Sequence, residues 1–237
     1  KGWWSSLPLL AVAAPCAVLL LGLRADTLGE RVGVFVIEAA GAVLLMSALL
    51  WASNRARAGV EHRAMHDPLT GLPNRSLFLD LVKYGFARAR RARTRAAVLF
   101  IDLDGFKLVN DTSGHAAGDQ LLRHVSAQLR SAVREEDTVA RLSGDEFAVL
   151  LPAVRDSADA MVVADKLLAA LAVPCQLGRQ SIVPHGSIGV SLFPDHGETP
   201  DDVLAAADAA MYAAKQAGRN RAVVAAANND AASAVHR

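Results

Sequence analysis

The sequence predicts an α/β (α+β) domain in which helices pack on one sheet, and three observations lead to this prediction. The run "AAVLFIDL", Ala96–Leu103, is apolar and bounded by polar segments, as is typical of a buried strand. Within residues 116–134, apolar side chains recur at spacings of three and four, which indicates an amphipathic helix. The runs "DTVARL" and "EFAVLLP" are separated only by "SGD", which indicates a hairpin. This order predicts a ferredoxin-like βααββαβ layer fold.

The remaining elements follow from the same rules. Leu122, Val125 and Leu129 form the apolar stripe of the helix within residues 116–134. Gly144 can supply the positive φ that a tight hairpin turn needs. The other expected elements are a helix, a strand and a last helix, at Ala158–Leu171, Ile188–Phe193 and Pro200–Ala217.

The N-terminal part has a different composition, which predicts a membrane anchor. Leu7–Leu23 carries no charge, and Val32–Ala52 carries only Glu38. A transmembrane helix needs about 20 apolar residues, and Trp3 and Trp4 suit an interfacial belt. We therefore predict a hairpin of two transmembrane helices, at about 7–23 and 32–52. The alternative is a signal peptide followed by a buried helix.

Charges beside the second span predict its orientation. Arg55, Arg57 and Arg63 follow this span, and positive charges favour the cytoplasmic side. The C-terminal part is therefore expected to face the cytoplasm from the inner (cytoplasmic) membrane. The predicted organisation is an anchor, a helical connector, a catalytic-type domain and a flexible tail, at 1–53, 54–66, 67–222 and 223–237.

Composition excludes several classes of protein. The 237 residues have a net charge of +1, so no basic bias indicates nucleic-acid binding. The arginine-rich stretch Arg88–Arg95 lacks interleaved aromatic residues, and we interpret it as a solvated loop. Cys16 and Cys175 show neither a disulfide framework nor a zinc-site spacing.

Acidic residues gather where two predicted strands meet. If the first strand pairs with the hairpin, Asp102 lies close to Asp145 and Glu146, because neighbouring strands are about 5 Å apart. Crowded carboxylates repel one another, and a divalent cation such as magnesium would relieve this repulsion, with the Leu103 carbonyl as a further ligand. The alternative for Asp104 is that it caps a helix beginning at Gly105.

Cations and polar residues accompany these acids. Lys107 lies one turn into the next helix, where an ammonium can reach a phosphate. Lys215 and Arg219 could clamp a polyphosphate, or could be solvated cations at a helix C-terminus. Asn110 and Asp119 have the donors and acceptors that recognise a guanine edge, although capping and turn roles would also explain them.

Four motifs in order carry a family resemblance: "DPLTGLPNR", "FIDLDGFKLVNDTSGHAAGD", "RLSGDEF" and "ADAAMYAAKQAGRN". With them, the chain from Asp67 to Asn220 resembles the GGDEF domains of diguanylate cyclases, which share the cyclase-palm fold and condense two GTP into cyclic di-GMP and pyrophosphate. The resemblance implies a magnesium (or manganese) ion held by Asp102, Leu103 and Asp145. It implies catalytic roles for Asp145, Glu146 and Lys107, and it implies substrate binding by Asn110, His115, Asp119, Gly144, Lys215 and Arg219.

One residue departs from the family pattern. Ser143 stands where the signature has its first Gly, and a Ser is accommodated there only if its φ stays negative. We therefore predict an active bacterial enzyme of signal transduction. The alternatives are a catalytically silent receptor for GTP or cyclic di-GMP, or a membrane module whose soluble part merely dimerises.

The family resemblance also implies assembly and regulation. One domain holds one GTP while the product joins two, so a homodimer is expected. Arg134 and Asp137 form an Arg-x-x-Asp string, which in this family is the inhibitory site for cyclic di-GMP. The alternative is a helix-terminal ion pair, which on a surface contributes below about 1 kcal/mol.

Overall fold

The computed structural model describes residues 39–51, 65–178 and 180–226, and the chain divides into two units, Lys1–His62 and Arg63–Arg237. In the first unit, residues 39–51 are helical and exposed. The predicted span at 7–23, residues 32–38 and 52 of the second span, residues 54–64 of the connector and residues 227–237 of the predicted tail 223–237 lie outside the described residues. Residues 223 and 224, also assigned to the flexible tail, belong instead to a β-strand, because they pair with the sheet. No helix in the described ranges is long and apolar enough to cross a bilayer.

The second unit is built on a five-stranded sheet with the strand order β2-β3-β1-β6-β7. The hairpin β2–β3 pairs with β1, β1 pairs antiparallel with β6, and β7 runs parallel to β6. The bounds of these strands are β1 Arg95–Leu103, β2 Thr138–Ser143, β3 Glu146–Val154, β6 Gly186–Phe193 and β7 Ala222–Val224. The predicted pairing of the first strand beside the hairpin is thus confirmed.

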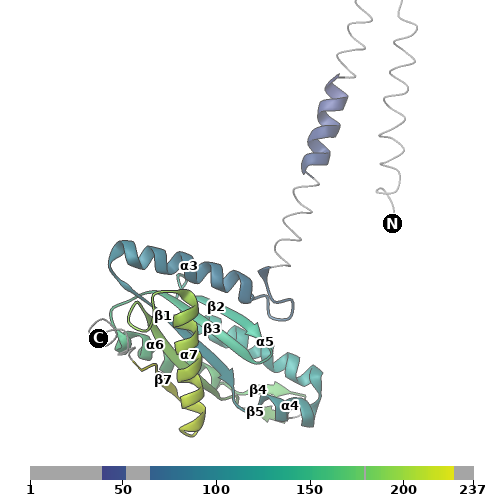
Figure 1. Ribbon diagram of the computed structural model, residues 1–237. Coiled ribbons are helices and arrows are strands. Elements are labelled where there is room, and N and C mark those ends of the chain that lie inside the picture. The colour runs from purple at the N-terminus through teal and green to yellow at the C-terminus, as the bar shows by residue number, and fades with distance from the viewer. Residues whose placement is uncertain (1–38, 52–64, 179, 227–237) are drawn as a thin grey trace, which may run out of the picture. The chain divides into compact units, whose positions relative to one another are not determined.

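Both faces of this sheet are covered, which explains the continuous apolar strands. Leu99 and Ile101 of β1 pack into one core cluster with helices α5 and α6, while Val98 and Phe100 pack into a second cluster with α3 and α7. Figure 1 shows these helices packed around the sheet. Successive side chains of a strand point to opposite faces, so β1 contributes to both cores. The helices are α3 Arg75–Ala92, α4 Phe106–Ser113, α5 His115–Ala132, α6 Ser157–Leu171 and α7 Pro200–Gln216.

The structure contains elements that the pattern did not predict. Helix α3 begins at its N-cap Asn74, whose side chain accepts a hydrogen bond from the Leu77 amide. Its last turn contains Arg90 and Arg91, and β1 begins at Arg95, so the interpretation of Arg88–Arg95 as a loop was wrong. The other additions are the small hairpin of β4 Cys175–Leu177 and β5 Gln180–Ile182, and the strand β7.

Candidate functional site

A cavity of about 200 Å³ lies where β1 ends and α4 begins. The residues around it come from β1, the β2–β3 turn, the start of α4 and the chain at and after the end of α7. They are Asp102, Leu103, Asp104, Gly105, Phe106, Lys107, Asp145, Lys215 and Arg219. The fold therefore brings together most of the acids and all three of the phosphate-binding cations that the sequence predicted.

The Asp102 carboxylate interacts with several other charged groups of this cavity. Its Oδ1 lies 2.8 Å from the Lys215 Nζ, and the Asp102 side chain is only 14% exposed. Burial raises the pKa of Asp102, the Lys215 ammonium opposes this shift, and the negative charges of Asp145 and Asp104 add to it. This carboxylate therefore lies where an added positive charge would be strongly favoured.

The acids occupy defined register positions at this end of the sheet. Asp102 pairs with Glu146 of β3 on one side and with Ser187 of β6 on the other. The Leu103 amide donates to the Asp145 carbonyl at 3.3 Å, which holds the β2–β3 turn against the end of β1. Within the described residues, the Asp145 carboxylate makes no hydrogen bond or ion pair.

Asp104 does not cap the following helix. The N-cap of α4 is Gly105, which makes no side-chain cap hydrogen bond. The Asp104 carboxylate instead accepts hydrogen bonds from the Ser187 hydroxyl at 2.9 Å and from the Asn220 amide at 3.0 Å. The proposed capping alternative is therefore wrong, and the adjacent polar residue Ser187 was missed because nothing in its apolar strand distinguishes it.

The β2–β3 turn accommodates the unusual serine. Gly144 has a φ of +43°, whereas Ser143 is absent from the non-glycine residues with positive φ. The exposed Ser143 hydroxyl donates to the Glu146 carboxylate. Ser143 therefore avoids a positive φ, which is the condition for a serine to be accommodated at this position.

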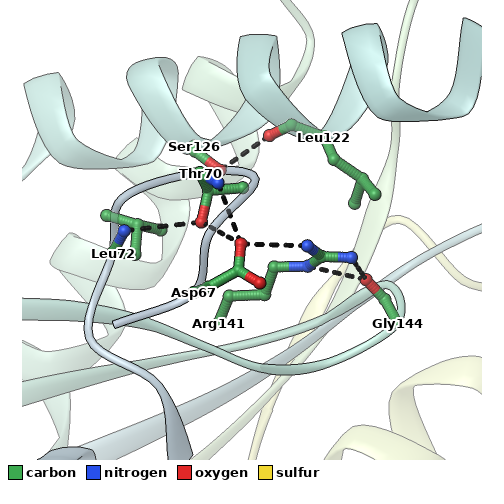
Figure 2. Close-up of polar contacts among 7 residues, drawn as sticks. All are labelled: Asp67, Thr70, Leu72, Leu122, Ser126, Arg141 and Gly144. Carbon is green, nitrogen blue, oxygen red and sulfur yellow. Dashed lines mark hydrogen bonds and ion pairs between the residues drawn. The ribbon is translucent and has the colours of Figure 1, made fainter. Parts of the chain in front are cut away.

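An arginine of β2 ties this turn to the start of the domain, as Figure 2 shows. The Arg141 guanidinium donates to the Gly144 carbonyl at 2.9 and 2.7 Å, and its Nη1 lies 3.0 Å from the Asp67 Oδ1. The same Asp67 oxygen accepts from the Thr70 amide and hydroxyl. Both side chains of the ion pair are largely buried, at 12% and 18% exposed. Sequence reasoning missed this network, because the two residues are far apart in the chain.

The predicted base-recognising residues lie on the α4–α5 pair. A Cβ added to Gly118 would lie 1.9 Å from the Asn110 Oδ1, so the glycine makes room for that amide. Asp119 follows this glycine on α5 and is exposed, as is His115 at the start of the helix. These three residues are not among those around the cavity, but Asn110 and Lys107 share helix α4.

Comparison with known proteins decides the family. Residues 64–221 match the family described as "Diguanylate cyclase, GGDEF domain". The chain belongs to the GGDEF family. This match covers the second unit from residue 64 up to residue 221, and it ends just before β7.

Several relatives of this GGDEF chain have been named or solved. It is 42% identical over 222 residues to the bifunctional diguanylate cyclase/cyclic di-GMP phosphodiesterase MucR of Pseudomonas aeruginosa, covering 93% of the chain and 30% of MucR. It is 45% identical to the diguanylate cyclase TpbB of the same species, covering 68% of the chain and 38% of TpbB. The chain thus spans well under half the length of these two relatives.

Solved structures of GGDEF domains have the same fold. The isolated GGDEF domain of TpbB superposes with a TM-score of 0.66 at 43% identity, covering 68% of the chain and 94% of that domain. The coiled coil and GGDEF domain of DgcB from Caulobacter crescentus, in complex with cyclic di-GMP, gives a TM-score of 0.70 at 26% identity, covering 79% of the chain and 99% of that structure.

The metal predicted for this GGDEF domain fits the donors around the cavity. No group of three or more His, Cys, Asp or Glu residues in the described ranges forms a ready metal cluster. The Asp102 and Asp145 carboxylates and a backbone carbonyl are nevertheless the oxygen donors that magnesium prefers, and magnesium usually completes its shell with phosphate and water. Burial raises the pKa of Asp102, the charges of Asp145 and Asp104 add to this shift, and the same like charges favour a bound cation.

The predicted product-site residues of this GGDEF domain lie at a second cavity, of about 630 Å³. The Asp137 carboxylate accepts a hydrogen bond from the Arg134 amide at 3.0 Å, and burial raises the pKa of Asp137. The Arg134 side chain is 78% exposed, and its guanidinium lies 3.8 Å from Glu136 rather than against Asp137. The alternative of an Arg134–Asp137 side-chain ion pair therefore does not describe this structure.

Proposed function

We propose that this chain is a diguanylate cyclase, which condenses two GTP into cyclic di-GMP and two pyrophosphate. The observation that supports this most directly is the convergence of Asp102, Asp145, Lys107, Lys215 and Arg219 around one cavity. Carboxylates that can hold a cation, beside cations that can hold phosphates, are what phosphoryl transfer requires. The family match supports the same activity.

In the proposed reaction, the 3′-oxygen of one GTP attacks the α-phosphorus of the other. The new bond joins this oxygen to the phosphorus, the bond to the β-phosphate oxygen breaks, and pyrophosphate leaves with the electron pair of that bond. The hydroxyl proton passes to a base or to solvent. The 3′-oxygen of the second GTP then attacks the α-phosphorus of the first in the same way. This step closes the ring and releases the second pyrophosphate.

The residues of the chain would bind and orient the nucleotide. Magnesium or manganese, held by Asp102, the Leu103 carbonyl and Asp145, would neutralise phosphate charge and lower the pKa of the attacking hydroxyl. Lys107, Lys215 and Arg219 would meet the phosphates as charge-assisted donors. Asn110 and Asp119 would recognise guanine, and Glu146 would lie beside the reacting groups through its pairing with Asp102.

The test is product formation by the full chain. Incubation with GTP and magnesium, followed by chromatography, should give cyclic di-GMP and two equivalents of pyrophosphate. Asp145→Asn should abolish turnover and leave the unfolding transition unchanged, because the carboxylate makes no contact that stabilises the fold. GTP or cyclic di-GMP binding without turnover by the wild type would instead support the receptor alternative.

We also propose that cyclic di-GMP binds at Arg134 and Asp137 and lowers activity. Three features support this proposal: the exposed guanidinium of Arg134, the adjacent Asp137 carboxylate, and the cavity that both residues border. A guanidinium offers a planar pair of donors to a guanine edge or a phosphate, and a carboxylate accepts from the guanine edge. Binding there, away from the acids of the first cavity, would fix the domains in an unproductive arrangement.

The N-terminal part is proposed to anchor the chain in the inner membrane with the GGDEF domain in the cytoplasm. The predicted spans Leu7–Leu23 and Val32–Ala52 support this proposal. So do the exposed apolar side chains within residues 39–51, among them Leu44 at 71% and Trp51 at 63% exposed. The Ser47 hydroxyl donates to the Val43 carbonyl, so it needs no water. Retention of the chain in membranes after alkaline extraction would test this anchor, and its release would contradict it.

A further inference from the structure

The turn that follows α7 has an unusual backbone. Gly218, Arg219 and Asn220 all have positive φ, of +110°, +61° and +46°. A non-glycine residue in the left-handed region is uncommon, and Asn accepts it more readily than Arg does. Such a conformation persists only where the surrounding structure holds it. The question is therefore what holds Arg219 in place.

Asp104, which also borders the cavity, contacts this turn directly. Its Oδ2 accepts the Asn220 amide at 3.0 Å, and its Oδ1 lies 3.9 Å from the Arg219 Nε. The Ser187 hydroxyl donates to Oδ1 at 2.9 Å and so orients the carboxylate. With the Asp104 side chain only 9% exposed, water competes little for these contacts.

The adjoining chain is held by backbone contacts as well. The Arg219 amide donates to the Ala214 carbonyl, and the Ile188 amide donates to the Arg221 carbonyl. These bonds join the turn to α7 and to β6, but neither involves the amide of Asn220. That amide depends on Asp104 alone among the described residues.

We propose that Asp104, oriented by Ser187, is a positioning residue that sets the Arg219 turn so that Arg219 faces the cavity next to Lys215. This inference rests on the proposed function, in which those two cations meet the phosphates of GTP. Both Asp104 oxygens already accept hydrogen bonds from the protein, which distinguishes Asp104 from the free carboxylate of Asp145. Asp104 thus acts through Arg219 and does not itself touch the nucleotide.

The first measurement tests the contact without any nucleotide. Hydrogen–deuterium exchange of the full chain should show faster exchange in the segment 217–221 for Asp104→Ala than for the wild type. Asp104→Asn keeps the side-chain shape if the alanine variant folds poorly. Asp80→Asn, at a surface carboxylate of α3, is the matched control and should leave this segment unchanged. Equal exchange in the wild type and both Asp104 variants would overturn the proposal.

The second measurement asks whether Asp104 works through Arg219. Calorimetry should show that Asp104→Ala weakens binding of the α,β-methylene analogue of GTP about tenfold, as expected for loss of a hydrogen bond to a charged group, and that it leaves GMP affinity nearly unchanged. In the Arg219→Ala background, Asp104→Ala should reduce the affinity for the analogue little further, because the effects of substitutions at coupled residues are not additive.

Two outcomes separate the hypotheses. The same tenfold loss in the Arg219→Ala background would overturn the positioning role and leave the proposed function intact. A wild type that binds no analogue would overturn the proposed function and, with it, the role of Asp104 toward phosphate. The exchange result would then still report whether Asp104 holds the turn.

Discussion

At the scale of single residues, Ser143 shows how much a family pattern tolerates. The signature glycine that it replaces adjoins Gly144, and only Gly144 has the left-handed backbone that disfavours a side chain. Ser143 is exposed, and its hydroxyl donates to Glu146, which is not among the residues around the cavity. Of the two glycine positions in the signature, the substitution therefore lies at the one whose backbone accepts a side chain.

We expect Ser143→Gly to change turnover by less than about threefold, because the lost hydrogen bond to Glu146 is exposed and the pairing of β3 with β1 still places Glu146 beside Asp102. Initial rates of cyclic di-GMP formation at saturating GTP would measure this. A silent wild type that becomes active with this substitution would show that the serine is inhibitory.

Gly118→Ala is expected to weaken GTP binding about tenfold or more, because the new Cβ must displace the Asn110 amide that lies 1.9 Å from its position. Titration calorimetry with the methylene analogue would measure the loss. The control is Asn110→Ala, in whose background Gly118→Ala should have little further effect. A full additional loss there would show that the glycine acts on something other than Asn110.

At the scale of elements, the sequence predicted the long strands and the periodic helices, and it failed where local pattern carries little signal. Helix α3 was missed because the arginines near its C-terminal end drew attention away from the apolar stripe of Phe78, Val82 and Phe86. Strand β7 has three residues and pairs parallel with β6, so only the tertiary fold defines it. The acids of the cavity were anticipated because Asp102 lies near the end of one regular strand and Asp145 lies directly before another.

The link between Asp67 and Arg141 should contribute to stability in a way that depends on pH. Burial of Asp67 disfavours its charge, but the hydrogen bonds from Thr70 and Arg141 outweigh this and lower its pKa below 3.8. A carboxyl group whose pKa is lower in the folded state stabilises that state at pH values above its pKa in the unfolded state. This stabilisation is lost as the pH falls through the pKa of the group in the folded state.

Asp67→Asn should therefore reduce the free energy of unfolding by about 1–2 kcal/mol at neutral pH. Urea unfolding at pH 7 and pH 5 should give nearly the same difference from the wild type, and the difference should shrink progressively as the pH falls below about 5. A difference that already disappears between pH 7 and pH 5 would contradict the lowered pKa.

At the scale of the whole molecule, the described residues place these acids and cations around one cavity, while the product of the proposed reaction contains two nucleotides. The proposed reaction would therefore require two chains with their cavities face to face, and a two-fold arrangement would satisfy this with one repeated interface. Anchors in one membrane would raise the local concentration of partners.

The rate per molecule of the detergent-solubilised chain should rise with protein concentration and level off when the dimer is complete. Parallel sedimentation measurements would report the fraction of dimer. A constant rate per molecule in a sample shown to be monomeric would contradict the requirement for two chains.

Inhibition by product should depend on Arg134. Titration of cyclic di-GMP should inhibit the wild type and should inhibit Arg134→Ala at least tenfold more weakly, as expected for loss of a charge-assisted contact. Arg123→Ala, at an exposed arginine of α5, is the matched control and should be inhibited like the wild type. Equal inhibition of all three proteins would place the regulatory site elsewhere.

The network around Asp67 also determines where a shortened chain can begin. A fragment starting at Arg75 would keep every helix and strand of the GGDEF domain, yet it would remove the carboxylate that holds Arg141. The amide of Asn74 donates to the Met65 carbonyl, so the ordered segment extends back at least to Met65. The smallest fragment that keeps the Gly144 turn in place therefore starts no later than Met65, ten residues before its first helix.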